Sequence, residues 1–95
     1  IGFPDPACEI DIVRSRLPGV SEARTAQVVS AVNHLREMDL EKLPGVAETI
    51  DWTQGLDAVG ATHLDEQSAL DTLGAVVKDR DDLEYTTRSI QDVLS

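Results

Sequence analysis

Apolar residues recur at three- and four-residue spacing along the chain, and proline or glycine interrupts this pattern several times. The spacing is that of one face of an α-helix, which turns once every ~3.6 residues. Pro18-Gly19, Pro44-Gly45 and Gly60 divide the pattern into segments, because proline removes a backbone donor and glycine destabilises a helix. Outside the short Ile1–Phe3 segment, no stretch shows the strict alternation or the β-branched and aromatic run that is typical of a strand. The sequence therefore predicts an all-α fold.

Capping residues set the expected boundaries of the helices. Asp5-Pro6 combines an N-cap with proline at the first helical position, and Ser21 caps the next segment. Thr62 with Asp65 three residues later resembles a capping box, and Asp81-Asp82 favours a helix start through the macrodipole. The expected helices cover residues 6–17, 22–37, 46–59, 64–78 and 81–94. We expect a single domain, residues 1–95, that forms a compact bundle of four to five short helices.

The third expected helix is apolar around much of its girth, and such a helix is expected at the centre of a bundle. Trp52 is expected in the core rather than at a ligand, because Leu56 and Val59 follow it at helical spacing. The other apolar positions expected to face inward are Ile10, Val13, Leu17, Val28, Val29, Ala31, Val32, Leu35, Val46, Ile50, Ala69, Leu70, Leu73, Val76 and Val77.

A short internal echo precedes two of these helices. Residues 17–22 and 43–48 share the pattern Leu-Pro-Gly-Val-x-Glu. A solenoid needs about three or more stacked repeats, and this pattern does not recur. We therefore interpret it as the same helix-start signal used twice.

The charge balance argues against several classes of partner. Eighteen acidic residues against eight basic ones give a net charge of -10, which repels a phosphate backbone. Three aromatic residues offer no stacking platform for single-stranded bases. The chain has one cysteine and no run of about 18 apolar residues, so neither a disulfide framework nor a membrane span is expected. The sequence predicts a cytoplasmic protein without nucleic-acid or membrane partners.

No complete catalytic or metal site is predicted. The chain lacks the Gly-x-x-x-x-Gly-Lys-Ser/Thr loop that cradles phosphates. His34 and His63 are far apart and fit no zinc pattern, so both are expected to be structural. The acidic cluster at 79–84 lacks the turn glycine and the bidentate acid of a calcium loop. Cys8 has no base nearby in sequence and is expected to be a buried or inert thiol.

One stretch carries a family resemblance. The segment Pro44-Gly45-Val46-Ala47-Glu48-Thr49-Ile50-Asp51-Trp52 resembles a segment of MoxR-type AAA+ ATPases, in the branch associated with maturation of carbon monoxide dehydrogenase and related metalloenzymes. Residues 3–6 are similar to the turn that leaves the last strand of that family's nucleotide-binding core. Residues 17–21 are similar to the end of its first lid helix, and residues 72–78 to a late lid helix. The matches run from about residue 3 to residue 80.

The resemblance implies that this chain is the C-terminal helical lid of a longer AAA+ subunit, with residues 1–5 as the tail of the core-to-lid connection. The opening on Ile1 rather than Met agrees with a piece of a longer polypeptide. The core then supplies the Walker motifs and binds ATP and Mg²⁺, while this fragment holds no cofactor and no catalytic residue. Expected partners are the lid's own core, neighbouring subunits of a ring and a protein with a von Willebrand factor A domain.

Lids of this superfamily place a sensor arginine near the start of their third helix, where it reaches the terminal phosphate. Here no arginine lies between Arg36 and Arg80. Lys42 is either a substitute for it or a solvated surface lysine. Together with Lys42, the residues expected near nucleotide are Gly45, Glu48 and Thr49.

Two other hypotheses remain at this point. A free-standing acidic adaptor would bind an amphipathic partner helix in an apolar groove. An acyl carrier is also small, acidic and helical, and Ser68 is the candidate for its modified serine. Ser68 lacks the preceding aspartate of such carriers, which disfavours that hypothesis.

Overall fold

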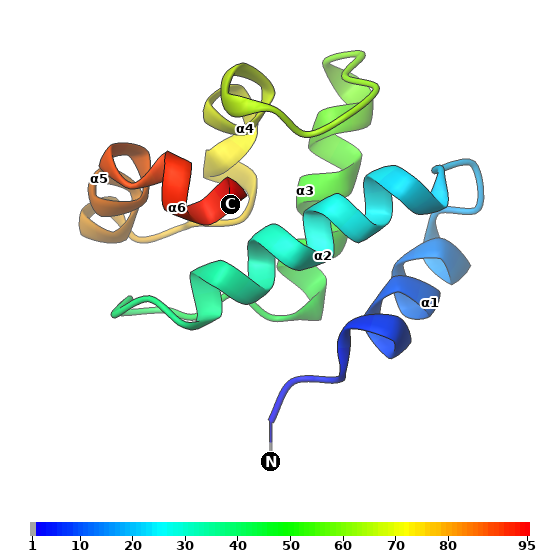
Figure 1. The fold of residues 1–95 in the computed structure, drawn as a ribbon, viewed down its shortest axis with the longest axis horizontal. Coiled ribbons are helices and arrows are strands. Elements are labelled where there is room, and N and C mark those ends of the chain that lie inside the picture. The colour runs from blue at the N-terminus through cyan, green and yellow to red at the C-terminus, as the bar shows by residue number, and fades with distance from the viewer. Residues whose placement is uncertain (1) are drawn as a thin grey trace.

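The computed structural model describes residues 2–95, and all regular structure within them is helical (Figure 1). In chain order the elements are α1 (Pro6–Arg16), α2 (Glu22–Arg36), α3 (Val46–Ala58), α4 (Glu66–Thr72), the 3₁₀ turn η1 (Leu73–Ala75), α5 (Arg80–Arg88) and α6 (Ile90–Leu94). The radius of gyration is 12.1 Å, close to the ~12 Å expected of one folded domain of this length. The predicted all-α bundle is confirmed, but the described residues form six α-helices rather than four to five.

The first two helices begin where their capping residues predict. The Asp5 carboxylate accepts a hydrogen bond from the Cys8 amide at 2.9 Å, and Pro6 is the first helical residue. The Ser21 hydroxyl oxygen accepts from the Arg24 amide at 3.1 Å. Each cap satisfies an amide that has no partner within its helix.

The fourth helix differs from the prediction at both ends. Asp65, not Thr62, is its N-cap: the Asp65 carboxylate accepts from the Ser68 amide, and the Ser68 hydroxyl accepts from the Asp65 amide. The Thr62 hydroxyl is bonded to the His63 ring instead. After Thr72 the helix tightens into η1 and stops, well short of the predicted residue 78.

The predicted helix over 81–94 is two helices. α5 begins one residue earlier than expected, at Arg80, because the carboxylate of Asp79 accepts from the amides of Asp81 and Asp82. It ends at Arg88, and the amide of the C-cap residue Ser89 bonds to carbonyls three and four residues back. The chain turns there, and Ile90 of α6 is buried in the core.

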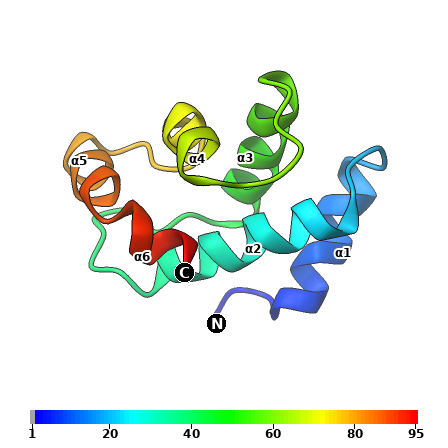
Figure 2. The ribbon, with the colours of Figure 1, turned by 45° about the horizontal axis from the view of Figure 1, so that its top comes forward.

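α2 and α3 form the centre of the bundle. α2 contacts α1, α3 and α6, whereas α3 contacts α1, α2, α4 and η1. Figure 2 shows α1 and α5 at opposite ends of α2. The central position predicted for the third helix is therefore confirmed.

Most of the predicted core positions are buried. The buried members are Val13, Val28, Val29, Ala31, Val32, Leu35, Trp52, Leu56, Ala69, Leu73, Val76 and Val77. Two predictions were wrong: Val59 is 57% exposed and Leu70 is 36% exposed. Val59 already lies past the end of α3, where Gly60 turns the chain with a positive φ of 74°, a conformation that glycine adopts without strain.

Trp52 of α3 is fully buried and has a polar partner. Its indole N–H donates to the Thr72 hydroxyl at 2.7 Å, and that hydroxyl donates to the Ser68 carbonyl one turn back at 2.7 Å. A buried indole needs such an acceptor. The bond joins α3 to α4 inside the core.

The two copies of the Leu-Pro-Gly-Val-x-Glu pattern both precede a helix, but in different registers. In the first copy Ser21 is the N-cap, and its hydroxyl accepts a helix amide. In the second copy Ala47 occupies the matching position, and its side chain has no atom that can accept a hydrogen bond. The helix there begins two residues earlier, with Gly45 as the N-cap.

Within residues 2–95, no helix is both long enough and apolar enough to cross a membrane.

Candidate functional site

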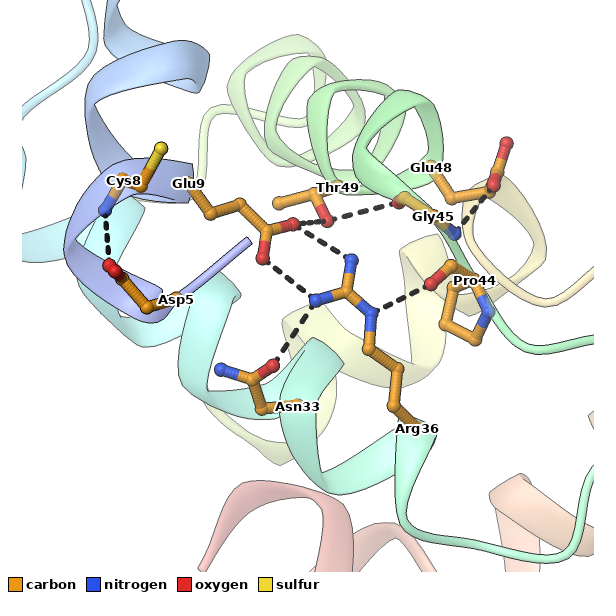
Figure 3. A network of polar contacts seen from close by, with 9 residues as sticks. All are labelled: Asp5, Cys8, Glu9, Asn33, Arg36, Pro44, Gly45, Glu48 and Thr49. Atoms are coloured by element: carbon orange, nitrogen blue, oxygen red, sulfur yellow. Dashed lines mark hydrogen bonds and ion pairs between the residues drawn. The ribbon is translucent and has the colours of Figure 1, made fainter. Parts of the chain in front are cut away.

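The Pro44-Gly45 turn before α3, which the sequence singles out, is held from the inside by Arg36 at the end of α2 (Figure 3). The Arg36 Nε donates to the Pro44 carbonyl at 2.8 Å, and its Nη1 donates to the Asn33 side-chain oxygen at 3.1 Å. The guanidinium thus ties the last turn of α2 to the entry of α3. An arginine does lie at this turn, although the local sequence has none.

Arg36 is neutralised by a buried carboxylate from α1. Its Nη1 and Nη2 donate to the two oxygens of Glu9 at 2.8 and 2.9 Å. The Glu9 side chain is 0% exposed and that of Arg36 is 5% exposed. Removing either partner would leave a buried charge uncompensated, which is the costly case for a buried ion pair. The bidentate geometry fixes the relative position of α1 and α2.

Thr49 completes this network from α3. Its hydroxyl donates to Glu9 Oε2 at 2.7 Å, so the Glu9 carboxylate is shared between α2 and α3. Thr49 is fully buried. Its hydroxyl is therefore committed inside the protein in this structure.

The segment before α1 packs on the same arginine. The Phe3 ring lies 4.0 Å from the Arg36 guanidinium carbon, the geometry of a cation–π contact. Phe3 is itself 45% exposed. The chain before α1 and the entry to α3 thus meet at one side chain.

Gly45 and Glu48 form the outer edge of the turn. The Glu48 carboxylate folds back and accepts from the Gly45 amide at 2.8 Å. This is one half of a capping box; a glycine has no side-chain oxygen with which to complete the other half. Unlike Thr49, Glu48 is only partly buried.

Lys42 lies in the loop between α2 and α3 and is exposed. Lys42 and Glu48 both border a surface pocket of about 220 Å³. The remaining lining residues are Leu43, Pro44, Val76 and Lys78. The structure thus brings together two of the residues predicted from sequence, and it adds Lys78, which follows η1.

A buried carboxylate on α5 anchors the loop that carries Lys42. Asp82 accepts from the Glu41 amide at 2.8 Å and from the Lys42 amide at 3.0 Å. It is 3% exposed. The prediction that Asp82 serves a helix start through its charge is incomplete, because its side chain also holds a loop that lies far away in sequence.

Glu9, Arg36, Asp82 and Lys78 were all missed as site residues. Two of them left a signal, since Glu9 precedes Val13 by four residues and Arg36 follows Val32 by four. A charged residue on the apolar face of a helix indicates a buried partner. No comparable pattern marks Asp82 or Lys78.

The remaining candidates stay apart from this turn. Cys8 lies in the first turn of α1 and is exposed. Of the two expected states, buried or inert, the buried one was therefore wrong, and the inert one stays a prediction. His34 contacts the Val93 carbonyl through Nδ1 at 2.8 Å, a structural role as predicted. His63 is exposed and lies 3.2 Å from Asp65. Ser68 is buried within the cap of α4.

The described residues at this turn offer groups that can bind a ligand. The described residues include no group of three or more histidine, cysteine or acidic side chains placed to hold a metal ion. What the turn offers is a hydrogen-bonded backbone, two lysines at one pocket and a contact through Arg36 with the chain before α1. Comparisons of the sequence with protein-family models and with curated proteins, and of the fold with solved structures, find no match.

Proposed function

We propose that this chain is the C-terminal lid of a MoxR-type AAA+ ATPase, which couples ATP binding and hydrolysis in a separate core to remodelling or metallocentre maturation of a partner protein. The resemblance of residues 44–52 to that family is the starting point. The compact all-helical fold is of the kind that a lid requires. ATP and Mg²⁺ would bind mainly to the core, and the chain would work in the cytoplasm as part of a ring.

The observation that carries the proposal is that one side chain, Arg36, contacts both the expected core-to-lid connection and the turn expected near nucleotide. The segment that would connect core to lid packs on Arg36 through Phe3. Arg36 in turn holds the Pro44 carbonyl of the turn expected to face nucleotide. A displacement of the connection would therefore act directly on that turn. This arrangement suits a domain that must move as a rigid body with the nucleotide state.

Arg36 does not replace the missing sensor arginine in this conformation. All of its named contacts are internal, and Glu9 neutralises its charge. Under the proposal, Lys42 takes the place of the sensor cation at the turn. Gly45 and Glu48 shape the turn beside it, and Thr49 supports the turn from within.

The first test is the coding sequence upstream of Ile1. The proposal expects a Gly-x-x-x-x-Gly-Lys-Ser/Thr motif roughly 200 residues before this segment. A gene that encodes no such motif would end the proposal. A start codon close to Ile1 would favour the adaptor hypothesis instead.

The second test uses the parent polypeptide and its ATPase rate. We expect Lys42→Ala to lower kcat about tenfold, as loss of a charge that stabilises the transferred phosphoryl group does. Arg88→Ala is the matched control, because Arg88 is an exposed cation on α5, away from the pocket that Lys42 borders. The 95-residue chain by itself is expected to show no ATP hydrolysis; measurable turnover by these residues alone would refute the lid assignment.

A further inference from the structure

Both lysines of the chain border the same pocket. Lys42 comes from the loop between α2 and α3, and Lys78 from the segment after η1. The pocket has a volume of about 220 Å³, and its apolar walls come from Leu43, Pro44 and Val76. In a chain with a net charge of -10, the presence of its only two lysines at one pocket is a distinct electrostatic feature.

The charges at this pocket favour an anion. Among residues 2–95, the ion pairs involve Arg14, Arg24, Arg36 and His63, and neither lysine takes part in one. The carboxylate at the pocket, Glu48, is already bonded to the Gly45 amide at 2.8 Å. The pocket is therefore lined by two lysines and by one carboxylate that is already bonded to the backbone.

The backbone around the pocket is fixed at three points. Asp82 accepts from the amides of Glu41 and Lys42, and Arg36 holds the Pro44 carbonyl. On the other side, the amides of Val76 and Val77 both bond to the Leu73 carbonyl. A ligand would therefore meet a formed pocket and would need to order only the two lysine side chains, which lowers the entropic cost of binding.

We propose that Lys42 and Lys78 together bind the phosphate groups of a polyphosphate ligand, with Lys78 as the second binding residue. Lysine ammonium groups are point charges with three donors each and suit phosphate oxygens. The pocket is smaller than the ~300–1,000 Å³ of a site that encloses a whole small molecule. It therefore accommodates phosphate groups and leaves the remainder of the ligand outside. The identification of that ligand as a nucleotide rests on the proposed function, but the anion site itself does not.

The test is a titration of the ¹⁵N-labelled 95-residue chain with inorganic tripolyphosphate, followed by amide chemical shifts at low salt. We expect saturable shifts confined to residues 41–48 and 76–78. Lys42→Ala and Lys78→Ala should each weaken binding at least fivefold, and Arg88→Ala should leave it unchanged. Binding should weaken steeply as salt is raised, because the lysines are exposed. Lys78→Gln serves in place of Lys78→Ala if the alanine variant unfolds.

Glu48→Gln separates this proposal from a cation site. The glutamine oxygen can still accept from the Gly45 amide, so the turn is kept while the negative charge is lost. We expect tripolyphosphate to bind about two- to threefold more tightly to this variant, because one negative charge near the surface is removed from the pocket. Binding that requires added Mg²⁺ and is abolished by Glu48→Gln would overturn the two-lysine site.

Four further results bear on the proposal. Shifts that never saturate, or a Lys78→Ala variant that binds like the unaltered chain, would refute the site. Repeating the titration with ATP in place of tripolyphosphate shows whether a nucleotide presents its phosphates to the same residues. Saturable tripolyphosphate binding combined with no Walker motif upstream would keep the anion site and end the lid assignment.

Discussion

Two arginines lie at opposite ends of α2, and the protein treats them differently. Arg24 and Arg36 continue the apolar stripe formed by Val28 and Val32, one before it and one after it. Arg36 binds a carboxylate that is 0% exposed, whereas Arg24 binds Asp57, whose side chain is 71% exposed. Two arginines on the same face of α2 thus pair with a buried carboxylate at one end and with a solvent-exposed carboxylate at the other.

The hydrogen bonding follows the same division. The Nε of Arg36 donates to the Pro44 carbonyl, while the buried Nε of Arg24 has no partner among residues 2–95. Arg24 does reach the Ala61 carbonyl just beyond α3. At the Arg36 end of the α2–α3 pair the arginine Nε is therefore hydrogen-bonded, whereas at the Arg24 end it is not. The Arg36 end is the one that carries the Pro44-Gly45 turn.

The largest effect on stability should come from removing Arg36. We expect Arg36→Ala to lower the free energy of unfolding by about 3–5 kcal/mol, because it leaves the Glu9 carboxylate buried without a counter-charge. Urea denaturation followed by circular dichroism measures this loss. Adding Glu9→Gln to Arg36→Ala should recover part of the stability. If the double variant is as unstable as the sum of the two single variants, the pair is not coupled as described.

Removing Arg24, at the other end of α2, should lower the free energy of unfolding by less. Arg24→Ala is expected to lower the free energy of unfolding by about 1–3 kcal/mol, mainly through the lost bond to the Ala61 carbonyl. Asp57→Ala should change it by less than about 1 kcal/mol, because Asp57 is largely solvated. Arg14→Ala, which breaks a pair of exposed residues, is the matched control for a surface pair. Should Arg24→Ala prove as damaging as Arg36→Ala, the contrast between the two ends would disappear.

The smallest effect concerns an exposed carboxylate that holds a helix cap. The Ser68 backbone amide, then its hydroxyl, lowers the pKa of Asp65 below its ordinary value of 3.8, and the nearby His63 lowers it further. A lowered folded-state pKa means that the stabilisation is present above that ordinary value and is lost as the pH falls through the folded-state value. Asp65→Asn keeps a capping oxygen but removes the titration. The stability gap between the two proteins should therefore narrow below about pH 4; a gap that is constant from pH 7 to pH 2 would contradict the assignment.

Local signals in the sequence were sufficient for the starts of the first two helices. Asp5-Pro6 and Ser21 placed the starts of α1 and α2 correctly. The end of α4 and the break at Ser89 were not predicted, because both depend on how short helices turn to bury Leu73 and Ile90 against the core. Such turns are decided by tertiary packing rather than by propensity.

The site was predicted only where it is local in sequence. Lys42 and Glu48 were recognised because they flank Pro44-Gly45. Asp82 of α5 binds the loop before this turn, and Lys78, after η1, borders the same pocket as Lys42 and Glu48. No short-range spacing in the sequence indicates either arrangement. The buried Glu9–Arg36 pair was predictable in principle from charges on apolar faces, but the choice of partner for each charge requires the fold.

Trp52, whose indole is bonded to Thr72, makes unfolding visible by fluorescence. Trp52 is the only tryptophan, and it is fully buried at the centre of α3. Its fluorescence should therefore shift to longer wavelength when the core opens, with no second indole to obscure the signal. Because α3 contacts α1, α2 and α4, we expect this emission to change when unfolding follows the loss of either arginine. The time course of the emission can then be compared between the Arg24→Ala and Arg36→Ala variants without any label.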